Sequence, residues 1–178
     1  DYRITVEDGK SCEASRVVDQ GSCDAVTFTF PFENHLPGEM FCISATVAGF
    51  VDVLGFQHSL IYDPTVLEMT SITTPGNLPG FSGASFNGPI SVPGGTQPLG
   101  SGRVTYTDLT GAGQTLTDGD EIYDLCFTVI GNLGECSPLI FADSPIPIEV
   151  STLTNSDAGF IINNGAVCVS SDPFFVDV

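Results

Sequence analysis

Two histidines, His35 and His58, are the only imidazole side chains that this chain offers for nucleophilic or acid–base chemistry. Nucleophilic catalysis needs a nucleophile, a base and a third group that orients the base. His35 stands beside Leu36-Pro37, which predicts a turn, and His58 falls on the apolar face of an expected strand. Neither lies near a G-x-S-x-G nucleophile elbow, which the sequence lacks. We therefore interpret both histidines as structural and expect that the protein is not an enzyme.

Acidic side chains gather around one turn, Asp118-Gly119-Asp120-Glu121, with Asp108 and Asp124 nearby. Calcium binds several oxygen ligands on flexible loops, but the spacing here is not that of an EF-hand. We favour a turn that leads into the next strand and keep a calcium site as the alternative. No other cofactor is expected. The candidate metal ligands are Asp108, Asp118, Asp120 and Glu121.

Six cysteines predict disulfides and an oxidising compartment. No C-x-x-C pair occurs, so the spacing of a zinc ribbon is absent. Cys12 and Cys23 would close a short loop, which favours their pairing. The remaining connectivity is open, because six cysteines allow fifteen pairings. The candidate disulfide residues are Cys12, Cys23, Cys42, Cys126, Cys136 and Cys168.

The charge balance excludes several classes of partner. The chain carries 22 acidic residues against 4 basic ones, a formal net charge of −18. Such a surface repels phosphate backbones and anionic membranes, so we expect no nucleic-acid binding. No run of about 18 apolar residues occurs, so no membrane insertion is expected. The chain has no Trp and 4 Tyr, which weighs against the aromatic stacking that sugar-binding sites use.

The elements that must position these residues are predicted to be strands throughout. Apolar and polar residues alternate, β-branched and aromatic types recur, and no segment shows sustained helical periodicity. About nine strands separated by turns predict an all-β sandwich or jelly roll. The expected strands are 25–30, 40–47, 53–62, 66–73, part of 84–92, 103–109, 121–130, 139–142 and 146–150, followed by a hairpin of 159–162 and 166–170 across Asn163-Asn164-Gly165.

The run from Gly55 to Glu68, GFQHSLIYDPTVLE, resembles the signature of cohesin domains, which marks a core strand and its exit turn. The segments Leu125–Val129 (LCFTV) and Asn164–Val169 (NGAVCV) resemble two further cohesin strands, in the same order along the chain. The resemblance implies a cohesin-like, nine-stranded jelly-roll β-sandwich. It also implies a non-catalytic module, which either binds dockerin modules or belongs to surface proteins of Bacteroidetes-type bacteria. Gly55 is expected to allow the close approach of another backbone.

The resemblance also implies a pairing of four cysteines. In the cohesin order, the strands of Cys42 and Cys126 lie side by side, which implies a disulfide between them and leaves Cys136 with Cys168. One face of the signature strand is expected to enter the core between the sheets. The side chains on that face are Phe56, His58, Leu60 and Tyr62.

Both ends of the chain extend beyond the cohesin-like region. We divide the chain into an N-terminal extension at 1–24 with a strand and a small disulfide loop, a β-sandwich at 25–170, and an extended tail at 171–178. The terminal segments could pair with the edges of their own module or add to the sheet of a neighbour, where main-chain hydrogen bonds would hold them. The candidate interface residues are Tyr2, Ile4, Val6, Phe174, Phe175 and Val176.

The leading hypothesis for function is an extracellular structural or adhesive module of a bacterial cell surface. It would join copies of itself head to tail in a fibre. The alternative is a receptor module that binds a dockerin-like protein partner, and a carbohydrate-binding module ranks third. The sequence begins at Asp1 without a methionine, which fits a mature chain after removal of a signal peptide. Together with the cysteines, this predicts an extracellular location.

Overall fold

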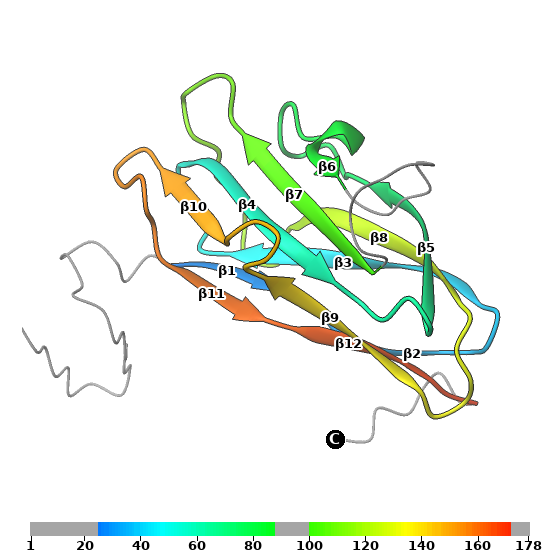
Figure 1. Cartoon of the computed structure of the whole chain (residues 1–178). Coiled ribbons are helices and arrows are strands. Elements are labelled where there is room, and N and C mark those ends of the chain that lie inside the picture. The colour runs from blue at the N-terminus through cyan, green and yellow to red at the C-terminus, as the bar shows by residue number, and fades with distance from the viewer. Residues whose placement is uncertain (1–24, 88–99, 172–178) are drawn as a thin grey trace, which may run out of the picture.

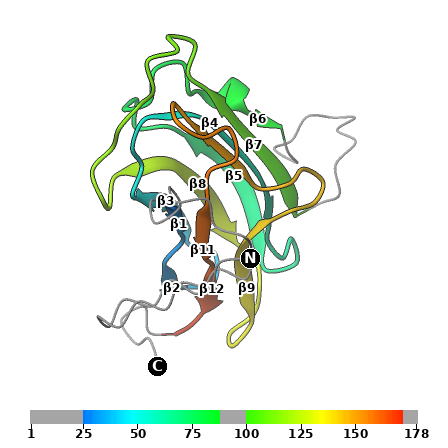
Figure 2. The ribbon, with the colours of Figure 1, turned by 90° about the vertical axis from the view of Figure 1, so that its left-hand side faces the viewer.

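Two β-sheets packed face to face form the described part of the chain, residues 25–87 and 100–171 of the computed structural model (Figure 1, Figure 2). The all-β sandwich expected from the sequence is confirmed. Within the residues described, no helix reaches the length and apolarity that a membrane crossing needs. The five-stranded sheet consists, in spatial order, of β11 (Phe160–Asn163), β1 (Val26–Thr29), β3 (Met40–Ala48), β8 (Glu121–Val129) and β5 (Leu67–Thr73).

The seven-stranded sheet forms the second layer. Its strand β4 (Val53–Ile61) pairs with β7 (Ser101–Thr107) on one side, and with β9 (Cys136–Ala142) and then β10 (Glu149–Thr152) on the other. A single turn of 3-10 helix, Gly83–Ser85, precedes β6. The strands, in spatial order, are β2 (Phe32–His35), β12 (Gly165–Val169), β9 (Cys136–Ala142), β4 (Val53–Ile61), β7 (Ser101–Thr107) and β6 (Phe86–Asn87), with β10 (Glu149–Thr152) beside β4.

Alternation along each strand decides which side chains enter the core. In β3, Ile43, Ala45 and Val47 are buried, whereas the residues between them face outward. Every second side chain of a strand lies on the same face, so one apolar row per strand is sufficient to cover a sheet. The row predicted for the signature strand is also buried, and this prediction is confirmed: its members are Phe56, His58, Leu60 and Tyr62.

Aromatic side chains fill the space between the sheets. Phe30, which lies between β1 and β2, stacks on Phe141 of β9 with ring centroids 4.3 Å apart and planes 16° from parallel. Phe28 packs against both Phe56 and Phe141, and its ring centroid lies 5.5 Å and 5.9 Å from theirs. Such pairs add about 1 kcal/mol each to the burial of their surface. The core therefore connects β1 in one sheet with β4 and β9 in the other.

A parallel ladder joins the two ends of the described chain and crosses from one sheet to the other. Strand β1 pairs in parallel with β11 in the five-stranded sheet, and β2 pairs in parallel with β12 in the seven-stranded sheet. The ladder continues through the crossing, because Phe30 N donates to Asn163 O at 3.0 Å and Ala166 N donates to Pro31 O at 3.3 Å. Gly165 lies at this point, and a Cβ built on it would overlap Pro31 O.

The crossing shows that the hairpin expected across Asn163-Asn164-Gly165 is wrong. Strands β11 and β12 follow each other in the chain but belong to different sheets. Asn164 does not form the turn of a hairpin; its Oδ1 accepts a hydrogen bond from Phe141 N at 2.9 Å. Asn-Gly favours a hairpin turn through local geometry, but here long-range pairing with β1 and β2 decides the path.

Other predicted elements differ in number and in bounds. Twelve strands are present in the described residues, more than the nine of the expected jelly roll, and β2 (Phe32–His35) has no counterpart among the expected ranges. Strand β10 lies at Glu149–Thr152 rather than 146–150, and β9 begins at Cys136 rather than at 139. His35, expected in a turn, is the last residue of β2. The division into 1–24, 25–170 and 171–178 stays a prediction.

We expect the substitution Gly165→Ala to lower the free energy of unfolding by about 3 kcal/mol, because the added methyl group overlaps the backbone of the crossing ladder. Urea denaturation at neutral pH measures the loss. Gly83→Ala is the matched control, since nothing lies within 4 Å of its Cβ position, and its effect should stay within about 0.5 kcal/mol. Equal effects of the two substitutions would contradict the role assigned to the crossing.

Buried His58 makes a second prediction possible. Its ring can donate from Nδ1 to Ser59 O at 3.0 Å and accept at Nε2 from the Tyr123 hydroxyl at 3.2 Å. Both ring nitrogens of a neutral imidazole are then used. Burial disfavours the charged ring and lowers the pKa of His58 to about 4.

The folded pKa of His58 lies below the unfolded value of about 6.5, so its contribution to stability is complete above pH 6.5 and declines as the pH falls towards 4. Between pH 7 and pH 5 we expect this histidine to cost about 2 kcal/mol of unfolding free energy. The double variant His58→Phe/Tyr123→Phe should lose that part of the pH dependence. Carboxylate repulsion is common to both proteins, so parallel pH profiles would contradict the prediction.

Candidate functional site

A hollow of about 450 Å³ opens on the outer face of the seven-stranded sheet, over β4, β7 and β10. Two rows of side chains cross these three strands. In one row Gly55 stands between Ser151 and Thr107, and in the next Gln57 stands between Glu149 and Thr105. Gly55 has no side chain, so its backbone forms the floor of the hollow. We call this hollow the polar groove and define it by Gly55, Gln57, Thr105, Thr107, Glu149 and Ser151.

Gly55 keeps the polar groove open because no larger residue fits there. A Cβ at this position would stand 2.8 Å from Tyr106 O and 3.6 Å from the Ser151 hydroxyl. The close backbone approach that we expected at Gly55 is therefore confirmed. The glycine of the signature strand thus serves the sheet and also shapes the surface above it.

The chemistry of the polar groove is that of hydrogen bonding. Gln57 Nε2 donates to Glu149 Oε2 at 3.1 Å, and both Thr105 and Thr107 are exposed. The aromatic residues of the same strands, Phe56 and Tyr106, are 3% and 4% exposed and pack in the core. The groove therefore presents hydroxyls, an amide and a carboxylate, without an aromatic face on which a sugar ring could stack.

Three of the four carboxylates proposed as metal ligands accept hydrogen bonds from the backbone. Asp108 accepts hydrogen bonds from Thr110 Oγ1 at 2.8 Å and from the backbone nitrogens of Thr110 and Gly113, both at 2.9 Å. Asp118 Oδ1 accepts from Gly49 N at 2.8 Å, and Asp120 Oδ2 accepts from Thr117 N at 2.8 Å. Glu121 begins β8, so the segment leads into a strand, as the favoured interpretation predicts. In the parts of the chain that the structure describes, no three potential metal ligands come together.

Hydrogen bonding also accounts for the charge state of Asp108. Burial by itself would raise the pKa of this carboxyl, but the hydrogen bonds from Thr110, Gln114 and Gly113 outweigh it and lower the pKa below its usual range. The charged form is therefore the one that the loop stabilises. The hydrogen bonds that Asp108 makes within its loop are sufficient to account for its charged side chain.

Neither histidine is placed for catalysis. His58 is fully buried between Ser59 and Tyr123 and is kept neutral by its surroundings. His35 stacks on Phe41 with ring centroids 3.7 Å apart. Its Nε2 lies 2.9 Å from Glu33 Oε2, and its Nδ1 lies 3.2 Å from Glu39 Oε1. No serine or threonine hydroxyl is involved with either ring in these contacts, so the residues support structural roles.

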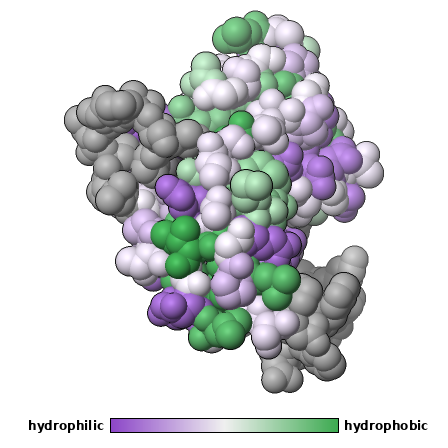
Figure 3. All heavy atoms as spheres, turned by 90° about the vertical axis from the view of Figure 1, so that its right-hand side faces the viewer, coloured by the Kyte–Doolittle hydropathy of each residue, from purple (hydrophilic) through white to green (hydrophobic). Residues whose placement is uncertain are grey.

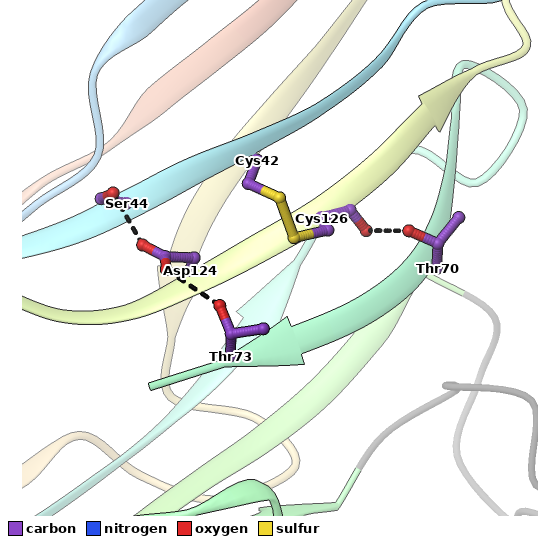
Figure 4. Close-up of a disulfide and its surroundings, with 6 residues drawn as sticks. All are labelled: Cys42, Ser44, Thr70, Thr73, Asp124 and Cys126. Carbon is purple, nitrogen blue, oxygen red and sulfur yellow. Dashed lines mark hydrogen bonds between the residues drawn. A yellow bond between two sulfur atoms is a disulfide. The ribbon is translucent and has the colours of Figure 1, made fainter. Parts of the chain in front are cut away.

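The outer face of the five-stranded sheet is stapled across β3, β8 and β5 (Figure 4). Cys42 and Cys126 form a disulfide between directly paired residues. Asp124 accepts from Ser44 Oγ at 2.7 Å and from Thr73 Oγ1 at 2.9 Å, so one carboxylate links all three strands. The side chains of Ser44, Thr73 and Asp124 therefore bond to one another on this face.

The second disulfide lies in the other sheet, between Cys136 of β9 and Cys168 of β12. Both pairings are those that the resemblance implied. Cys12 and Cys23 lie outside the described residues, as do the interface candidates Tyr2, Ile4, Val6, Phe174, Phe175 and Val176.

Sequence reasoning did not find the polar groove. Its signal is present in β4 and β7, where Gln57, Thr105 and Thr107 alternate with apolar residues, beside a glycine. The third wall, Glu149 and Ser151, comes from a strand far along the chain, and its register against β4 is set by tertiary structure.

Comparison with known proteins supports the fold alone. No protein-family model matches the sequence, and no curated protein matches it. Among solved structures, the seventh ScaB type I cohesin from Pseudobacteroides cellulosolvens is 15% identical, with a TM-score of 0.66, and the match covers 86% of this chain and 98% of that one.

Two further structures agree. A type I cohesin–dockerin complex from Clostridium thermocellum matches with 13% identity, a TM-score of 0.65, and coverage of 82% of this chain and 99% of that one. A non-cellulosomal cohesin from the hyperthermophilic archaeon Archaeoglobus fulgidus matches with 16% identity, a TM-score of 0.62, and coverage of 83% and 92%. The chain therefore has the β-sandwich fold of the cohesin domains.

Proposed function

We propose that this chain is a non-catalytic extracellular module that binds protein surfaces and joins copies of itself head to tail. The observation that carries the proposal is the position of the chain exits. The chain enters the sandwich at β1, beside Gly159, and leaves it after β12, beside His35. These two points lie at opposite ends of the sandwich (Figure 1).

A chain that enters and leaves the sandwich at opposite ends suits a heterologous contact between copies. A contact in which the terminal segment of one copy meets a different surface of the next repeats without closing, and it builds an open fibre. The segment expected to form the joint is the alternating strand Tyr2-Arg3-Ile4-Thr5-Val6, whose apolar members share one face. Strand addition would supply main-chain hydrogen bonds, and the apolar row would supply specificity.

The cysteines and the charge support a role outside the cell. One disulfide in each sheet ties two neighbouring strands together, and such bonds persist in oxidising surroundings. A net charge of −18 on each copy opposes self-association, so salt should strengthen a joint between copies. A joint with a basic partner would respond to salt in the opposite direction.

The head-to-tail joint predicts loss of assembly when the N-terminal strand is changed. Ile4→Asp places a charge on the apolar face and should abolish filaments in electron microscopy and lower the mass measured by light scattering. Thr5→Asp is the matched control, because it adds the same charge to the opposite face, and it should assemble like the parent chain. A full-length chain that stays monomeric at high protein and salt concentration would contradict the proposal.

A second candidate function is that of a receptor for a dockerin-like partner, with the polar groove as the docking surface. The fold likeness includes a cohesin solved in complex with a dockerin. Between residues 25 and 171, Arg103 is the one lysine or arginine in the sequence, so a basic partner surface would be complementary.

We expect Thr107→Arg to fill the polar groove and to weaken binding of a dockerin-like module at least about tenfold, because a bulky charge blocks the centre of the contact. Thr46→Arg, on the outer face of the five-stranded sheet, is the control and should leave the dissociation constant unchanged. Calorimetry with purified dockerin-like modules measures both. Equal affinities for the two variants would rule out the groove as the docking surface.

A further inference from the structure

Four large apolar side chains are exposed at the end of the sandwich where β12 finishes. Figure 3 faces this end and shows apolar side chains at the surface between polar ones. We call this surface the apolar end and define it by Leu36, Met40, Ile130 and Leu133, which are 41%, 79%, 50% and 60% exposed. Neighbouring apolar side chains left in water mark an interaction surface.

The backbone pairing brings these four residues to one place. Gly38 N donates to Val129 O at 3.0 Å and Val129 N donates to Glu39 O at 2.9 Å, so Met40, the first residue of β3, lies near Ile130, which directly follows β8. Leu36 follows His35, whose carbonyl accepts from Ser170 N at 3.0 Å. Leu133 precedes Gly134, whose nitrogen donates to Val169 O at 2.8 Å.

These bonds place the last residues of β12 between Leu36 on one side and Leu133 on the other. The described chain reaches Ser171 at this point. The next residues in the sequence are Asp172-Pro173-Phe174-Phe175-Val176-Asp177-Val178. Seven residues in extended form reach about 24 Å, which is enough to span the end of a sandwich. Pro173 has no N–H group, so it disfavours a direct continuation of the β12 ladder.

The carboxylates near the apolar end are held in their own turns. Glu39 Oε2 accepts from Leu36 N at 2.8 Å, and Glu135 Oε2 accepts from Asn132 N at 2.7 Å. The hydrogen bond from Leu36, followed by that from His35, lowers the pKa of Glu39. Both carboxylates therefore have hydrogen-bond partners within their own turns, whereas Leu36 and Leu133 of the same turns stay exposed.

We propose that residues Phe174 to Val176 of the same molecule pack over the apolar end and cover it. The match is chemical as well as geometric: three consecutive large apolar residues follow within reach of four exposed apolar ones, and two phenyl rings supply the largest area to bury. The packing is intramolecular, because the segment begins at the surface that it covers. It does not rest on head-to-tail assembly, which the N-terminal strand is proposed to mediate.

Methyl NMR of the full chain tests the proposal, with carbon-13 at the methyl groups of Ile, Leu and Met. The chain has two methionines, exposed Met40 and buried Met69, which is 7% exposed and serves as the internal control. We expect nuclear Overhauser contacts from the rings of Phe174 and Phe175 to the methyl groups of the apolar end. We also expect a ring-current shift of the Met40 methyl resonance that is independent of protein concentration.

The double variant Phe174→Ala/Phe175→Ala should return the Met40 methyl group to the position of a free methionine and leave Met69 unchanged. A Met69 resonance that stays in place shows that the variant is folded. A Met40 resonance at the free position in the parent chain would overturn the proposal. So would ring contacts that vanish on dilution or that appear between labelled and unlabelled molecules, since these would assign the apolar end to a second copy.

Discussion

The parallel pairing of the first and last strands of the described chain is the constraint on which this structure depends. Val26 to Thr29 lie beside Phe160 to Asn163, more than 130 residues later in the sequence, and the same two stretches stay paired after both have crossed into the second sheet. Pairing over such a separation is costly in chain entropy and is stabilised by the burial that it completes. The ladder, together with the pairing of β1 with β3, holds Phe28 against Phe56 and Phe30 against Phe141.

The position of the surfaces follows from that ladder. Because β1 begins at one end of the sandwich and β12 finishes at the other, the points where the chain enters and leaves the sandwich lie far apart. The polar groove lies on the outer face of the seven-stranded sheet, and the apolar end lies where β12 stops between two turns. The two surfaces are therefore separate from each other on the module. The rigidity of the sheets, tied by two disulfides, keeps those surfaces in a fixed relation.

The acidic side chains of the described loops and strands bond to backbone and hydroxyl groups, and they do not gather into one metal site. Asp108 and Asp120 accept backbone hydrogen bonds within their own turns, Asp118 accepts one from the distant Gly49, and Asp124 ties three strands through hydroxyls. A carboxylate that accepts such bonds stabilises a loop without a metal ion. The remaining charge keeps the surface negative, which selects against polyanions and favours basic partner surfaces. Residue chemistry here therefore points to recognition rather than to reaction.

The sequence by itself determined most of the strands, the sandwich and the inner row of the signature strand. Alternation with period two is a local property, and it reports which residues pair inward whatever sheet they join. The resemblance to cohesins added the order of strands, and with it both disulfide pairings in the described region. Buried Phe56, His58, Leu60 and Tyr62 follow from these two sources.

Only the tertiary structure decided which strands and side chains from distant parts of the sequence lie beside one another. The Asn163-Asn164-Gly165 segment carries a strong local turn signal, yet it crosses between sheets because β1 and β2 hold both sides of it. The polar groove needs Glu149 and Ser151 to stand in register with Gln57 and Gly55, which no local pattern specifies. The apolar end likewise joins residues from two turns that only the end of β12 brings together. Local sequence sets the face of each side chain, whereas register and sheet membership come from pairing between distant segments, and these created the surfaces where we place function.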